Sequence, residues 1–260
     1  MMSPGELVTL GGVRDELGRQ EDGIIHALLE RSRLSRNADA YVAGAASAAE
    51  LGFGGAEGSL LEQALRATER VHGRLRRYDS PGERAFFPDA LPCPAAPSTV
   101  PVLMTPWMDV DMNREVVEGY VERVVPAVTR PGADASPGPA VIADVRCLQS
   151  LSKRVHLGLY VAEAKFRADR ELYTRLIGQN DRGAIMDSLT DAAVERRVTA
   201  RVREKADAHD WGGGGATPAS VVAVFVDWLM PLTKAAQVRY FMRRLDGGGG
   251  RGLAPPSGGE

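Results

Sequence analysis

The sequence has little cysteine, little histidine and no excess of charge of either sign. Cys93 and Cys147 are too few for a disulfide framework or a cysteine zinc site, which favours a reducing compartment. The four histidines show no HExxH or paired spacing, so we expect no metal site and place them at the surface or the core edge. With 32 basic and 34 acidic residues, the net charge is −2, and the field of the whole molecule would draw neither nucleic acid nor a membrane surface.

Long hydrophobic runs and targeting segments are also missing. The longest apolar candidate, residues 221–232, is interrupted by Asp227, whereas a membrane span needs roughly 18 or more apolar residues. The first residues lack a basic region followed by an apolar one, so we expect no secretory signal. We therefore expect a cytoplasmic protein, with the plastid as the alternative if a transit peptide has been removed.

Nucleotide-binding and hydrolase motifs are absent. The glycines of GFGGAEG, residues 52–58, do not match GxGxxG and follow no predicted strand, and no P-loop, GxSxG or kinase motif occurs. The chain of 260 residues is 44% hydrophobic, enough to bury a substantial core. This composition excludes disordered and collagen-like chains.

Helical periodicity dominates the chain, and strand-like alternation is scarce. Ser59 and the pair Thr217–Pro218 have the residue types that begin helices. We predict an all-α, single-domain bundle of long helices over residues 1–246, followed by a disordered Gly/Pro-rich tail over 247–260. Residues 86–106 are expected to form an ordered loop. The predicted helices cover residues 13–34, 59–75, 113–128, 141–167, 170–177, 181–188, 191–208 and 218–245.

Two cations share a stripe with apolar side chains on the longest predicted helix. Arg154, Val161 and Lys165 are spaced i, i+7 and i+11, and eleven residues return to within about 20° of the starting direction. Arg154 and Lys165 then lie about 16 Å apart along the axis, so their long side chains can meet around a small dianion. Ordinary surface charge would explain either residue alone.

Further polar groups lie beside apolar stripes on other predicted helices. Thr233 and Gln237 are spaced i, i+4 and so face the same way, and Asp191 and Glu195 repeat that spacing on the preceding helix. Arg14 begins the first predicted helix, beside its apolar side. Together these groups favour a site in the core of the bundle over ordinary solvated charge.

Five blocks of the sequence resemble one family in order and in content. They are VRDELGRQEDGIIHALLERS (13–32), FFPDALP (86–92), CLQSLSKRVHLGLYVAEAKF (147–166), AAVERRV (192–198) and PLTKAAQVRYFMRRLD (231–246). The chain resembles the eukaryotic chorismate mutases of the all-helical type over nearly its whole length.

The resemblance implies an all-helical, homodimeric enzyme that converts chorismate to prephenate, the branch step toward phenylalanine and tyrosine. It implies no cofactor and no metal, because the reaction is an intramolecular pericyclic rearrangement. A relative that has lost catalysis and serves as a binding or regulatory partner is the alternative.

Six residues of this chain occupy the family's site positions. Arg14 and Arg154 match the arginines that hold the two substrate carboxylates, and Lys165 and Gln237 match the positions that contact the ether oxygen. The remaining matches are Glu195, for the ring hydroxyl, and Thr233, a threonine of the site. A silent relative would be expected to lose some of these residues.

Two positions of the site depart from the fungal branch of the family. Gln237 stands where that branch has glutamate, and an amide donates a hydrogen bond without first being protonated. Activity should therefore be flat between about pH 5 and 8. Asp191 stands where the fungal branch has asparagine, and a carboxylate there would repel a dianion unless it points outward or pairs with a cation. It is a weak site candidate.

A second site, for an aromatic amino-acid effector, is implied between the subunits. Arg76, Arg77 and Gly138 match the family's effector positions. The serine and threonine that accompany them in regulated relatives are replaced here by Pro139 and Ile142. Proline lacks a backbone N–H and isoleucine lacks a hydroxyl, so regulation by tyrosine, phenylalanine or tryptophan is expected to be weak or lost.

Overall fold

The computed structural model describes residues 9–45, 49–53, 57–80, 82–92 and 110–245. Within these ranges the chain is helical, and its only extended pairing is an isolated bridge between Ser35 and Arg130. The helices are α1 (Leu10–Ser32), α3 (Leu60–Arg74), α4 (Asn113–Gly119), η7 (Tyr120–Val124), α5 (Val125–Val128), α6 (Gly138–Ala168), α7 (Arg170–Gly178), α8 (Arg182–Leu189), α9 (Ala192–Asp207), α10 (Pro218–Ala223), η8 (Val224–Leu229) and α11 (Met230–Arg243), with short η turns at Ala38–Tyr41, Ala49–Phe53, Arg77–Asp79 and Pro88–Ala90. The predicted all-α fold is confirmed.

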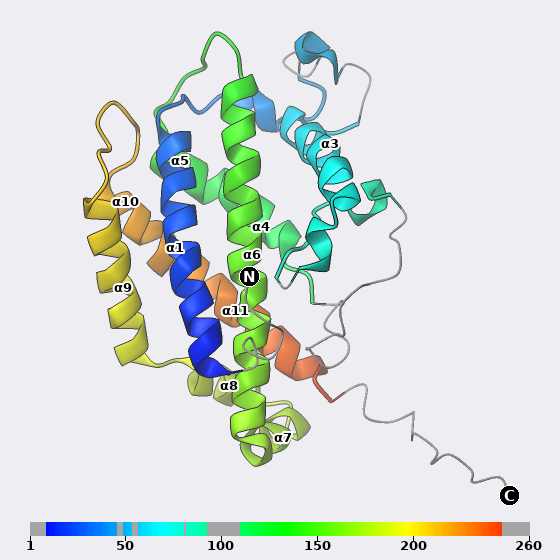
Figure 1. Cartoon of the computed structure of the whole chain (residues 1–260), viewed down its shortest axis with the longest axis vertical. Helices are drawn as coiled ribbons and strands as arrows, with labels where there is room; N and C mark the ends of the chain where they lie inside the picture. The colour runs from blue at the N-terminus through cyan, green and yellow to red at the C-terminus, as the bar shows by residue number, and fades with distance from the viewer. Residues whose placement is uncertain (1–8, 46–48, 54–56, 81, 93–109, 246–260) are drawn as a thin grey trace, which may run out of the picture.

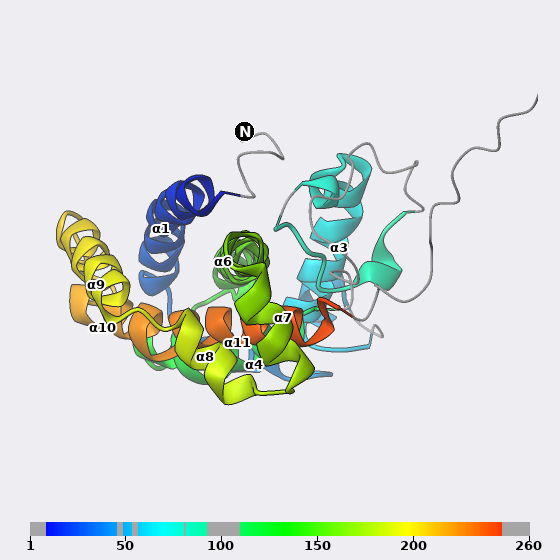
Figure 2. The same cartoon turned by 90° about the horizontal axis from the view of Figure 1, so that it is seen from below.

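Helix α6 forms the centre of the bundle. Helices α1 and α11 pack most extensively against it, while α3 lies on its other side and α9 lies beyond α1 (Figures 1 and 2). The run from α10 to α11 passes α9 at one end and α6 at the other. Helices α1, α6, α9 and α11 therefore enclose one region of the molecule.

Local sequence signals explain where several helices begin. The Ser59 hydroxyl accepts a hydrogen bond from the Glu62 N–H, and the Glu62 carboxylate accepts one from the Ser59 N–H, which forms a capping box. Thr217 caps α10 in the same way, with proline at the first helical position. Helix α6 begins at residue 138, three residues before the predicted start at 141.

The predicted helices 113–128 and 218–245 each contain a π-helical segment, η7 and η8. Such segments shift the register of one face by about one residue without ending the helix. Residues 93–106 of the predicted ordered loop and the predicted tail at 247–260 lie outside the described residues.

One histidine is buried, and the prediction of a surface or core-edge position is wrong for it. His156 on α6 is 1% exposed, and its Nε2 accepts a hydrogen bond from the Met112 N–H. Its Nδ1 lies 2.8 Å from the Ser152 carbonyl oxygen, so both ring nitrogens have partners in the core. Apolar periodicity does not reveal a histidine whose two nitrogens are both satisfied inside the core.

Among the described residues, no cluster of histidine, cysteine and acidic side chains fits a metal ion.

One helical stretch among the described residues, Pro218–Arg243, is long and apolar enough to cross a membrane by length and composition alone. Its α10 and α11 segments pack against α9, α8 and α6, and Phe225, Leu229 and Phe241 are buried there. A long core helix passes the same test, and these contacts are those of a core helix.

Three buried carboxylates connect the helices around the central region. Asp144 on α6 accepts from the Arg31 guanidinium of α1, and Glu163 on α6 accepts from the Tyr240 hydroxyl and from Arg244 near the end of α11. The third is Glu21 on α1, which accepts from the Arg201 guanidinium of α9. Hydrogen bonds from more than one donor offset the cost of burying each charge, so these contacts fix the relative positions of the helices.

Candidate active site

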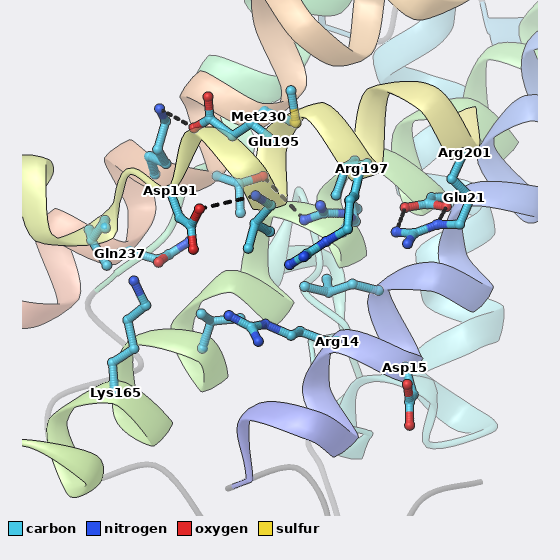
Figure 3. A pocket seen from close by; sticks show the side chains of 18 residues that line it. Arg14, Asp15, Glu21, Lys165, Asp191, Glu195, Arg197, Arg201, Met230 and Gln237 are labelled. Atoms are coloured by element: carbon cyan, nitrogen blue, oxygen red, sulfur yellow. Dashed lines mark hydrogen bonds and ion pairs between the residues drawn. The ribbon is translucent and has the colours of Figure 1, made fainter. Parts of the chain in front are cut away.

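The side chains of α1, α6, α9 and α11 enclose a cavity of about 290 Å³. This volume is close to the lower end of the roughly 300–1,000 Å³ of small-molecule sites. All six residues predicted for the site line the cavity, and Asp191 lines it as well (Figure 3). The cavity lining contains six basic and four acidic side chains, so its charge is net positive.

The two cations predicted on α6 both reach the cavity. Arg154 is only 6% exposed, its Nη1 donates to the Thr233 hydroxyl at 3.5 Å, and its Nε has no hydrogen-bond partner among the described residues. Burial lowers the pKa of Arg154 to about 10, so it is charged at neutral pH. Lys165 donates to the Ser188 carbonyl oxygen at 3.0 Å, and burial and the charge of Arg14 lower its pKa.

Helix α11 places an amide and a hydroxyl on the cavity wall. Thr233 and Gln237 are 5% and 6% exposed, and the Thr233 hydroxyl donates to the Leu229 carbonyl oxygen of the preceding turn. Both side chains pack against Gly158 of α6, where an added Cβ would lie 2.7 Å from Thr233 Cγ2 and 3.6 Å from Gln237 Cγ. The glycine allows α11 to approach α6 closely enough for these groups to reach the cavity. Sequence periodicity did not single it out.

Arg14 and Glu195 reach the cavity from α1 and α9. Arg14 is exposed at the mouth, and Figure 3 shows its side chain extending from α1 into the space below α9. Glu195 is held by Lys234 of α11, whose Nζ lies 2.9 Å from Oε1. This pairing of a predicted site residue was not anticipated from the sequence.

Asp191 is the N-cap of α9. Its Oδ1 accepts hydrogen bonds from the Ala193 and Val194 N–H groups at 2.9 and 3.1 Å. The bond from Val194, together with the charges of Arg197 and Arg14, holds the pKa of Asp191 below its usual range. The helix end stabilises this carboxylate, which gives it a structural role that does not depend on a ligand.

Ion pairing leaves an excess of positive charge in the cavity. Glu21 is 1% exposed and forms two short hydrogen bonds with Arg201, at 2.6 and 2.7 Å, which join α1 to α9. Glu195 is paired with Lys234, as described above. The cavity cations without an ion pair to any described residue are Arg14, Arg154, Lys165 and Arg197. Such an arrangement is suited to a ligand with more than one negative charge.

The candidate effector residues lie outside this cavity. Arg76 pairs with Asp79 at 2.7 Å, and Arg77 pairs with Glu83 at 2.9 Å and donates to the Gln149 side-chain oxygen. Gly138 is the first residue of α6. The structure thus gives both arginines carboxylate partners within the same chain.

The sequence of the chain is similar to those of known proteins of one family. The family model described as chorismate mutase type II matches residues 142–238. Chorismate mutase 1, chloroplastic, of Petunia hybrida is 40% identical over 93% of this chain and 77% of its own length. Chorismate mutase 2, cytosolic, of Zea mays is 38% identical over 93% of this chain and 98% of its own length.

Solved structures agree with the sequence relatives. The chorismate mutase of Candida albicans in complex with L-Trp superposes with a TM-score of 0.85 at 32% identity, over 94% of each chain. AtCM1 with tyrosine bound in its allosteric site gives a TM-score of 0.81 at 40% identity, over 92% of this chain and 97% of its own. The chain therefore belongs to the eukaryotic all-helical chorismate mutase family.

Proposed function

We propose that this protein rearranges chorismate to prephenate in the cavity between α1, α6, α9 and α11. Arg14 and Arg154 each hold one substrate carboxylate, because a guanidinium binds carboxylate with fixed, two-pronged geometry. Lys165 and Gln237 donate to the ether oxygen. Glu195 accepts a hydrogen bond from the ring hydroxyl of the substrate. Thr233 contacts the substrate beside Arg154.

The reaction needs positioning and charge stabilisation rather than a nucleophile. The substrate must adopt a compact, chair-like conformer, and holding that conformer removes the freedom that opposes the reaction in water. Negative charge develops on the ether oxygen as its bond to carbon breaks. Donors held in place by α6 and α11 stabilise that charge without reorganising, and losing one such donor costs about 3 to 4 kcal/mol in comparable sites.

Arg154 is the observation that carries the proposal. A buried guanidinium with an unsatisfied Nε, facing a cavity that contains three other unpaired cations, is costly unless a ligand provides the missing negative charge. A dicarboxylate supplies that charge. Lys165 and Gln237 also line this cavity. Catalysis needs both donors in one space, whereas a protein that only binds a partner does not.

Turnover of chorismate by the purified protein tests this function. We expect enzyme-dependent loss of the ultraviolet absorbance of chorismate, with prephenate recovered as phenylpyruvate after acid treatment. A folded protein that binds prephenate but does not consume chorismate would support the silent-partner alternative instead.

We propose that the protein is a homodimer and that the second copy covers an apolar face of α3 and the start of α6. Val71 on α3 is 56% exposed, Leu75, which follows the end of α3, is 73% exposed, and Ile142 on α6 is 59% exposed. Exposed large apolar side chains are often covered by a partner at protein interfaces. We expect light scattering to give twice the mass of one chain at micromolar concentration. A monomer under these conditions would contradict this assignment.

We propose that aromatic amino acids regulate this enzyme weakly or not at all. Pro139 offers no N–H and Ile142 offers no hydroxyl, while Arg76 and Arg77 already pair with carboxylates of their own chain. Saturating tyrosine, phenylalanine or tryptophan should change the apparent substrate affinity by less than the ~5-fold of ordinary allosteric coupling. A larger response would show that these residues still form an effector site.

The chain matches both cytosolic and chloroplastic relatives over most of its length. We propose the cytosol as its compartment, with the chloroplast as the alternative. Fractionation of the source cells followed by immunodetection decides between the two.

A further inference from the structure

Arg197 of α9 lines the cavity but has no role in helix packing and is not one of the six proposed site residues. One face of α9 lines the cavity, with residues spaced i, i+3, i+4 and i+7. These residues are Val194, Arg197, Val198 and Arg201. Arg197 lies in the middle of that face. Figure 3 shows its side chain extending toward the space into which Arg14 extends from α1.

The two arginines of this face have different surroundings. Arg201 forms two hydrogen bonds with the buried Glu21, so its role in joining α1 to α9 is clear. Arg197 forms no hydrogen bond or ion pair with any residue that the structure describes. It acts on Asp191 through its charge, as Arg14 does, but the hydrogen bonds of Asp191 go to the N-terminus of α9.

We infer that Arg197 is a further substrate-binding residue, which shares with Arg14 the carboxylate of chorismate that lies nearer the cavity mouth. This inference rests on the proposed function. Arg154 is buried and so holds the deeper carboxylate, whereas Arg14 and Arg197 are exposed and extend into the same space from the neighbouring helices α1 and α9. Two guanidinium groups then bind one carboxylate, each through its own pair of N–H donors.

Arg197 contributes to substrate binding and not to the chemical step. The carboxylates of chorismate keep their charge throughout the rearrangement, since the developing charge is on the ether oxygen. A contact to a carboxylate therefore stabilises the bound substrate and the transition state equally. Losing such a contact raises KM and leaves kcat in place.

The test compares Arg197→Ala with Arg196→Ala. Arg196 is the neighbouring residue on α9, is exposed and does not line the cavity, so both variants remove one positive charge from the same turn. For Arg197→Ala we expect a roughly 10-fold rise in KM at low salt, as for one charged hydrogen bond at an exposed site, with kcat within about twofold. Arg196→Ala should match the unmodified protein, and Arg197→Lys should recover part of the loss because it restores the charge without the two-pronged geometry.

Calorimetric titration with prephenate, which also has two carboxylates, separates this inference from the proposed function. Weaker prephenate binding by Arg197→Ala than by Arg196→Ala supports the role of Arg197, even if the unmodified protein does not turn over chorismate. Equal KM and equal prephenate affinity in the two variants would overturn it, and so would a loss confined to kcat. Failure of the unmodified protein to bind prephenate would overturn it as well.

Discussion

Replacing Arg154 with alanine should reduce kcat/KM by about 10³-fold or more while the protein remains folded. The guanidinium is buried at the cavity floor, with an Nε that has no partner among the described residues, so its removal deprives a substrate carboxylate of its donor. Thermal unfolding should show equal or greater stability, because a buried and incompletely paired charge has been removed. Steady-state kinetics and circular dichroism measure the two effects.

Arg146→Ala is the matched control for this substitution. Arg146 lies on the same helix, is exposed and pairs with Glu30, so its loss removes the same charge outside the cavity. We expect nearly unchanged kinetics. If Arg154→Ala instead lost its fold, or kept its activity, then Arg154 would serve the packing of α6 and α11 and not the substrate.

The same guanidinium predicts an alkaline limit for the unmodified protein. Burial favours the neutral form, so the pKa of Arg154 is lowered to about 10, and burial lowers the pKa of Lys165 in the same direction. Arg154 is charged below about pH 10, and kcat/KM should fall as the pH rises through that value. Below about pH 10 the buried charge of Arg154 lowers the stability of the folded protein. This destabilisation is relieved as Arg154 loses its proton above that pH.

Replacing Gln237 with glutamate should make activity depend strongly on pH. The side chain is 6% exposed, and burial raises the pKa of a carboxyl group. Only the protonated acid can donate to the ether oxygen, so the variant should be active at pH 5 and lose activity as the pH rises. By pH 8 we expect kcat to be about 10²- to 10³-fold below that of the unmodified protein, whose profile should be flat from about pH 5 to 8.

Gln179→Glu provides the matched amide-to-acid change, because Gln179 is exposed at the end of α7 and does not line the cavity. Its profile should follow that of the unmodified protein. A sharp loss of activity between pH 5 and 8 in the unmodified protein, with binding intact, would contradict the role of Gln237.

Local periodicity predicted the helices and placed several polar groups beside apolar stripes, and the resemblance to the family identified six of these groups as site residues. Arg154 and Lys165 share a face of α6 through their spacing alone, and Thr233 and Gln237 do so on α11. That these faces meet depends on Gly158, where the two helices approach closely. Spacing within one helix carries no information about such contacts between helices.

The features that the sequence did not reveal depend on partners far away along the chain. Whether an arginine of α9 is paired or free depends on α1, since Glu21 is the partner of Arg201 and no described carboxylate forms an ion pair with Arg197. His156 is buried because Met112 and Ser152 satisfy both of its nitrogens. Charge and hydropathy along the sequence cannot distinguish these cases.

A crystal structure with a dicarboxylate analogue of the bicyclic transition state tests the central claim most directly. We predict that the analogue fills the cavity, with one carboxylate on Arg154, the other on Arg14, and its ether oxygen within hydrogen-bonding distance of Lys165 and Gln237. An analogue that binds elsewhere, or that lies in the cavity without contacting Arg154, would contradict the assignment of this cavity as the active site.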